Sequence, residues 1–131
     1  MKNTESLKDV IEKYKNFYNR LTPIYSDAIK EQVYFNMAGF KHLIFKNKHR
    51  RKNSEIYNRM VLIPLIRPVI RKCKNEIETR IREEIIDGKE VVVEYKALEA
   101  KVGKSSTRVR VVIKKIGKKG RYYFQSIMKY N

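Results

Sequence analysis

The 131-residue sequence predicts a single α+β domain in which N-terminal helices pack on a C-terminal three-stranded antiparallel β-meander. Apolar residues recur at helical spacing through much of residues 6–86, whereas the last third of the chain is rich in Val, Ile and Tyr. Two glycine-containing segments, residues 103–106 and 117–120, divide that last third into three strands. We therefore expect N-terminal helices over residues 1–36, a histidine-bearing segment with central helices over 40–86, and the meander over 90–130.

The N-terminal part is expected to be helical. Ser6–Leu21 has a clear helical apolar spacing, and Pro23 ends this helix and can occupy the first position of a second helix over Ile24–Asn36. Phe40–Phe45 is too short to distinguish a helical turn from a strand. Lys46–Asn53 is expected to be a solvated basic loop or a helix end.

A longer central helix is expected next. Helical spacing runs from Ile56 to Ile70, and Ser54 is the expected N-cap. Pro64 and Pro68 must kink or split this helix, because each removes a backbone donor. Asn75–Ile86 is predicted to be a further short helix, followed by a turn at residues 87–88.

The predicted strands are Glu90–Val102, Thr107–Ile116 and Arg121–Tyr130. In the middle strand, alternation directs Val109, Val111 and Ile113 to the face that packs on the helices. The opposite face then carries Arg108, Arg110, Val112 and Lys114. Neither face of the last strand is purely apolar, so its orientation stays open.

The charge distribution points to a polyanionic ligand. The net charge is +17, yet no Asp or Glu occurs between Glu31 and Glu55 or after Glu99. A Lys-rich, AT-biased genome would explain the number of lysines, but not the confinement of many acids to residues 76–99. We therefore expect contact with nucleic acid, RNA first and DNA as the alternative.

Several other classes of protein are disfavoured. The single cysteine, Cys73, allows no internal disulfide and no Cys-rich zinc site. No signal peptide and no apolar run of about 20 residues is present, so a cytoplasmic protein without membrane contact is expected. The acids are not clustered as a catalytic Mg²⁺ site requires, and no phosphate-binding glycine loop occurs, so no cofactor is expected.

His42 is the candidate for acid–base chemistry. It is flanked by Lys41 and Leu43, and an imidazole can take or give a proton in phosphodiester cleavage while cations stabilise the phosphorane. A lone histidine is, however, more often structural than catalytic. His49 lies within a basic run and is expected to be solvated. The candidate nucleic-acid contacts are Lys41, Arg50, Arg51, Arg108, Lys114, Lys118, Lys119, Arg121 and Tyr123.

The element order, with the stretches GFKHLIFK, NRMVLIPLI and RVRVVIKK…GRYYFQSI, resembles the phage-associated nucleases of the barnase–EndoU–colicin–RelE superfamily over Val33–Tyr130. The resemblance implies a small metal-independent ribonuclease, often a toxin or part of a phage or mobile-element protein. It places the family's histidine at His42, its helical arginine at Arg59, and its last-strand hydroxyl at Ser126. The basic positions of its middle strand fall on Arg108, Arg110 and Lys114.

Three hypotheses follow. The leading one is a metal-independent endoribonuclease that uses His42 with Arg59, Arg110 and Ser126. The second is a non-catalytic RNA- or DNA-binding module. The third is an interaction module for an acidic antitoxin or immunity protein, which is compatible with the first. The first hypothesis requires His42 to lie within reach of the basic face of the middle strand.

Overall fold

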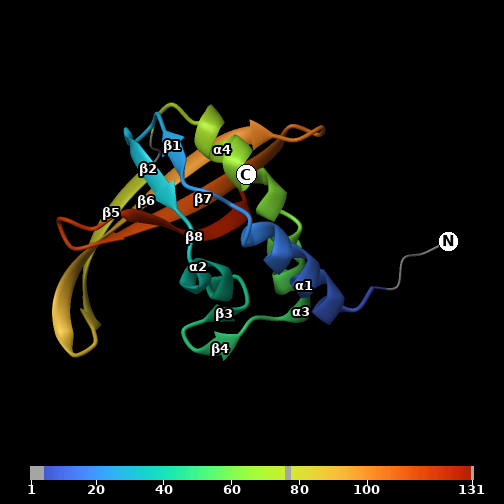
Figure 1. The fold of residues 1–131 in the computed structure, drawn as a ribbon, viewed down its shortest axis with the longest axis horizontal. Coiled ribbons are helices and arrows are strands. Elements are labelled where there is room, and N and C mark those ends of the chain that lie inside the picture. The colour runs from blue at the N-terminus through green and yellow to red at the C-terminus, as the bar shows by residue number, and fades with distance from the viewer. Residues whose placement is uncertain (1–4, 76–77, 131) are drawn as a thin grey trace.

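The computed structural model describes residues 5–75 and 78–130, and it shows a six-stranded mixed sheet with helices packed on one face (Figure 1). The protein is α+β, but the predicted three-stranded meander is wrong. Four long strands, β5 to β8, form the body of the sheet, and two short strands, β1 and β2, extend it at the β8 side. The strand order is β1-β2-β8-β7-β6-β5.

The long strands are β5 (Glu78–Ile86), β6 (Lys89–Val102), β7 (Thr107–Ile116) and β8 (Tyr122–Lys129), each antiparallel to the next. The helix predicted over residues 75–86 is wrong where the structure describes it, since β5 occupies this segment; residues 76–77 lie outside the described residues. Ile81 and Ile85 are four residues apart, which imitates a helical period, but pairing with β6 along the whole strand fixes the extended form.

The N-terminal region contains one helix instead of two. Helix α1 (Leu7–Tyr18) begins after Ser6, whose side chain accepts a hydrogen bond from the Asp9 amide at 3.1 Å. The predicted second helix over residues 24–36 is wrong, because this segment forms the hairpin of β1 (Ile24–Ser26) and β2 (Glu31–Tyr34). Strand β2 then pairs in parallel with β8, a tertiary contact that local spacing does not reveal.

The central region forms a series of short elements: α2 (Met37–His42), β3 (Phe45–Lys46), β4 (His49–Arg50), α3 (Asn53–Met60), the 3₁₀ turn η1 (Ile63–Leu65) and α4 (Ile66–Lys72). Asn36 caps α2 by accepting a hydrogen bond from the Gly39 amide at 3.1 Å. The expected basic loop is a β-hairpin whose turn residues, Asn47 and Lys48, have φ of 51° and 68°.

The expected splitting of the central helix is confirmed. Pro64 lies in η1, and Pro68 lies in the first turn of α4, where a missing backbone donor removes no intrahelical hydrogen bond. The predicted N-cap at Ser54 is wrong by two residues, since α3 begins at Asn53 and Lys52 holds the cap position without a side-chain hydrogen bond.

The hydrophobic core lies between the helices and one face of the sheet. The predicted inward residues of β7, Val109, Val111 and Ile113, are all fully buried there, which confirms the orientation of this strand. Helix residues such as Ile56 and Ile66 complete the same core. The face of the sheet that carries Arg108, Arg110, Val112 and Lys114 therefore points away from the core and is available to a ligand.

Candidate active site

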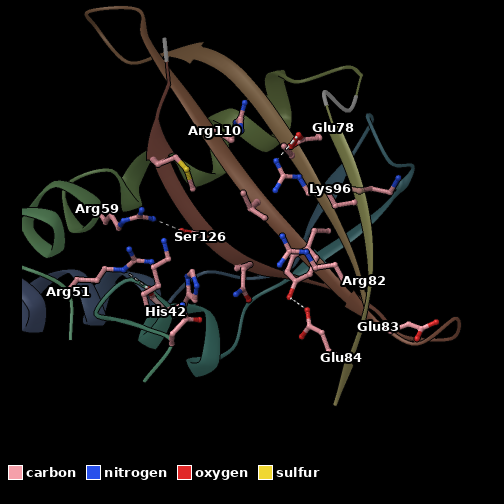
Figure 2. Close-up of a pocket in the computed structure, with 18 residues that line it drawn as sticks. His42, Arg51, Arg59, Glu78, Arg82, Glu83, Glu84, Lys96, Arg110 and Ser126 are labelled. Carbon is pink, nitrogen blue, oxygen red and sulfur yellow. Dashed lines mark hydrogen bonds and ion pairs between the residues drawn. The ribbon is translucent and has the colours of Figure 1, made fainter. Parts of the chain in front are cut away.

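A cavity of about 750 Å³ lies over this outer face of the sheet (Figure 2). Figure 2 shows His42, Arg51 and Arg59 gathered at one side near Ser126, while Arg82, Glu83 and Glu84 lie at the opposite side, on β5. All four residues predicted to be catalytic line the cavity: His42, Arg59, Arg110 and Ser126. The site thus joins elements that are far apart in the sequence.

The helical residues reach the cavity because part of the outer edge of β8 is left open by β2. Strand β2 pairs with β8 only at Tyr122 and Tyr123, and helices α2 and α3 also pack against β8. Arg59 on α3 extends over this edge, where its guanidinium donates to the Ser126 hydroxyl at 2.6 Å and to the Ile127 carbonyl at 3.3 Å. Arg59 therefore satisfies an edge carbonyl and holds the hydroxyl at the cavity wall.

A β-bulge in β8 decides the orientation of Ser126. Ile113 of β7 pairs with Phe124, but Val112 pairs with Ser126, so Gln125 is an extra residue between the two pairs. Strict alternation would direct Ser126 into the core together with Phe124. Because of the bulge, Phe124 and Ile127 both face the core while Ser126 shares the outer face with Val112.

His42 is the last residue of α2 and is held as an uncharged imidazole. Its Nδ1 is enclosed and has no hydrogen-bond partner among the described residues. Burial, and after it the positive charges of Arg51, Arg59, Lys114 and Lys46, together lower the pKa of His42 to about 4. The cluster is therefore positive around a neutral ring, which suits an anionic ligand.

Arg51 supports His42 from behind. Its side chain is buried, Nε donates to the His42 backbone carbonyl at 3.1 Å, and its guanidinium pairs with Glu55 at 3.4 Å. Arg51 also lines the cavity. Arg51 is predicted to contact nucleic acid; in the structure it fixes the end of α2 that carries His42.

In the basic row of β7, formed by Arg108, Arg110 and Lys114, two side chains interact with other residues of the protein. Arg110 forms an ion pair with Glu99, which lies directly opposite it on β6. Lys114 places its ammonium 5.6 Å from the centre of the Tyr95 ring and is close enough to lower the pKa of His42. Arg108 is exposed at the end of the row. Lys114 is therefore the member of the row whose charge acts on His42, although it does not line the cavity.

Of the predicted nucleic-acid contacts, Arg51 lines the cavity, and the others do not: Lys41, Arg50, Arg108, Lys114, Lys118, Lys119, Arg121 and Tyr123. Arg50 donates to Asn53 at 2.7 Å, and Lys118 and Lys119 are exposed in the β7–β8 turn. The guanidinium of Arg121 lies 4.6 Å from the centre of the Tyr34 ring, and the Tyr34 and Tyr123 rings are 5.9 Å apart.

The far wall of the cavity was not predicted. It includes Arg80, Arg82 and Glu84 of β5 and Tyr95 of β6. The Tyr95 hydroxyl donates to Glu84 at 2.6 Å, and burial together with this carboxylate raises the pKa of Tyr95 to about 12. The alternation of Arg80, Arg82 and Glu84 is the sequence signal for this wall, but it was masked by the apparent helical spacing of the isoleucines.

Within residues 5–75 and 78–130, no group of three or more His, Cys, Asp or Glu side chains is arranged to hold a metal ion. No described helix is long and apolar enough to cross a membrane. No family model matches the chain, and neither the curated proteins nor the solved structures contain a significant match. The site must therefore be interpreted from its own chemistry.

Proposed function

We propose that this protein is a metal-independent endoribonuclease and that the cavity at His42 is its active site. The observation that carries the proposal is a neutral, enclosed imidazole surrounded by Arg51, Arg59 and Lys114, with a hydroxyl held by Arg59 in the same cavity. Cations around an uncharged proton acceptor are the parts that RNA cleavage by the substrate's own 2′-hydroxyl requires.

Substrate binding adjusts the basicity of His42. A pKa near 4 is too low for an efficient general base at neutral pH. A bound phosphodiester adds negative charge beside the four cations that act on His42 and offsets their effect on the pKa of the ring. The pKa of His42 therefore rises when RNA is bound, which makes the imidazole a better proton acceptor in the complex than in the free protein.

The reaction follows from these positions. The 2′-oxygen attacks phosphorus while its proton passes to His42; Nε2 is the acceptor, because Nδ1 is enclosed. The Arg59 guanidinium and the Ser126 hydroxyl stabilise the charge on the phosphoryl oxygens. The bond from phosphorus to the 5′-oxygen breaks, and the Lys114 ammonium gives that oxygen a proton. The products are a 2′,3′-cyclic phosphate and a 5′-hydroxyl, and no metal takes part in the step.

A cross-strand row beside the cluster favours a single-stranded substrate. Strand register aligns Tyr34, Tyr123, Lys114, Tyr95 and Arg80 across five neighbouring strands, about 4.8 Å apart. Aromatic rings interspersed with cations can contact unpaired bases and the phosphates between them. Because this row includes Lys114, a strand bound along it brings a phosphate close to His42.

The experiment compares cleavage of labelled single-stranded RNA in EDTA by the wild type, His42→Ala and His49→Ala. Histidine 49 is the matched control, because it is exposed on β4 and lies outside the cavity lining. We expect the His42 variant to lose at least about 100-fold in rate and the His49 variant to keep its rate. RNA that is retarded in a gel but cut by no variant would support the non-catalytic binding module.

A toxin-like role is part of the same proposal. An unspecific ribonuclease in the cytoplasm would stop growth, so expression of the wild type in bacteria should arrest growth and His42→Ala should relieve the arrest. High-yield expression of an active wild type without growth loss would contradict the toxin role, but not the ribonuclease activity.

A further inference from the structure

Strand β5 is an exposed edge with an apolar surface. Among the described strands, only β6 pairs with it, and the β5–β6 hairpin projects from the body of the molecule (Figure 1). Ile81 and Ile85 are 68% and 74% exposed, the highest values among the large hydrophobic residues of the described chain. Val92 of β6 lies opposite Glu83, on the same face, and is 44% exposed.

An edge of this kind invites pairing with another strand. Monomeric proteins usually protect a long edge with proline, a bulge or an inward-pointing charge. β5 has nine residues, pairs regularly with β6 throughout, and contains neither Pro nor Gly. Its outer backbone groups and the two exposed isoleucines, with Glu83 between them on the same face, therefore form a surface that a further β-strand can cover.

The charges of β5 are complementary to the same strand in reverse. When two copies run antiparallel and are centred on Glu83, Ile81 of each copy lies opposite Ile85 of the other. Arg82 then lies opposite Glu84, twice, on the other face of the sheet. Centring on Arg82 instead would oppose two arginines and place each Ile81 against a Glu83 carboxylate.

We propose that a second copy of this chain pairs with β5 through an antiparallel two-fold contact centred on Glu83, and so joins the two sheets into one. The contact covers the four isoleucines and forms two Arg82–Glu84 ion pairs. It opposes the two Glu83 carboxylates, which is its one unfavourable feature. The isoleucines of the contact lie on the face opposite the basic row of β7, whereas Arg82, Glu83 and Glu84 also line the far side of the cavity.

Single-cysteine variants test the register. Residue 83 is the one position that meets its own copy, at a separation that a disulfide can span. We expect Glu83→Cys to form a covalent dimer under mild oxidation, whereas Ile81→Cys should not, because its two copies lie four residues apart, about 13 Å. The wild type, whose Cys73 is buried, is the control. Equal cross-linking of the two variants would overturn the proposed register.

A charge swap tests the contact in solution by light scattering and sedimentation. Arg82→Glu and Glu84→Arg should each weaken dimerisation at least about 10-fold, and the double variant should restore it, since both pairs re-form with reversed sign. Glu83→Gln should tighten the dimer. Tyr95→Phe is the control, because it removes the hydrogen bond between Tyr95 and Glu84 that Glu84→Arg also removes. This control variant should dimerise normally. A monomeric wild type, or a folded double variant that stays monomeric, would refute the proposal.

Discussion

The proton affinity of His42 has a consequence for stability that can be measured without any substrate. In the folded protein the pKa of this imidazole is lowered from 6.5 to about 4, first by burial and then by the surrounding cations. Between pH 6.5 and about 4, His42 therefore binds a proton in the unfolded chain but not in the folded chain. The contribution of neutral His42 is fully present above pH 6.5 and is lost as the pH falls towards 4.

The magnitude follows from the size of the shift. A difference of one pKa unit corresponds to about 1.4 kcal/mol, so the full effect is at most about 3.5 kcal/mol. Solvent contact of the half-buried ring reduces it to about 1–3 kcal/mol. Other groups also titrate in this range. The informative quantity is therefore the loss of unfolding free energy in the wild type beyond the loss in His42→Gln, which keeps a polar side chain but cannot titrate.

Urea denaturation at about pH 7.5 and about pH 4 gives this difference. We expect the wild type to lose about 1–3 kcal/mol more than His42→Gln on acidification. His49→Gln is the matched control and should lose as much as the wild type does. If His42→Gln and the wild type lose the same free energy, the imidazole is not held neutral by the fold, and the reasoning about the cavity is wrong.

Three further changes test the geometry of the site and its support. Ser126→Ala removes the hydroxyl held at the cavity wall and should lower RNA cleavage by about 10-fold or more, while unfolding free energy falls by only about 1 kcal/mol, as urea titration will show. Gly39→Ala would place a Cβ 2.3 Å from the backbone oxygen of Phe124, so it should displace α2 from β8 and lower the unfolding free energy by about 1–3 kcal/mol in the same assay. Deleting Gln125 removes the bulge and leaves the other residues of β8 on their present faces of the sheet, so circular dichroism should show a folded chain. Deleting Val112 from β7 moves the residues on one side of the deletion to the opposite face of the sheet and should prevent folding.

The parts of the fold that depend on local pattern were predicted from the sequence. The amphipathic spacing of α1, the alternation of Val109, Val111 and Ile113, and the splitting of the central helix near Pro64 are all determined by neighbouring residues. The sequence resemblance also named His42, Arg59, Arg110 and Ser126, which the fold brings to one cavity. Their catalytic roles stay predictions.

The parts that depend on distant contacts were not predicted. Strands β1 and β2 are extended because β2 pairs with β8, and β5 is extended because β6 pairs with it; neither pairing leaves a decisive local signal. The bulge at Gln125 likewise depends on the register with β7. Without it, alternation places Ser126 on the core face beside Phe124.

The charge pattern was also only partly informative. The absence of acids from the last strands correctly indicated a basic outer face, but it did not reveal that Glu99 on β6 neutralises Arg110. The opposed position of these two residues is a property of the strand register. The positive charges that act on His42 come from Lys46, Arg51 and Arg59 together with Lys114 of the sheet.

The central claim is that this cavity cleaves RNA by means of the substrate's own 2′-hydroxyl and without a metal ion. The most direct test is to incubate the wild type, in EDTA, with a single-stranded RNA and with the same oligonucleotide carrying a 2′-deoxy nucleotide at each mapped cleavage position. We predict fragments that end in 2′,3′-cyclic phosphate and 5′-hydroxyl from the RNA, and intact 2′-deoxy oligonucleotide that still binds. Cleavage of the 2′-deoxy oligonucleotide at the same positions, or products with a 5′-phosphate, would contradict the account.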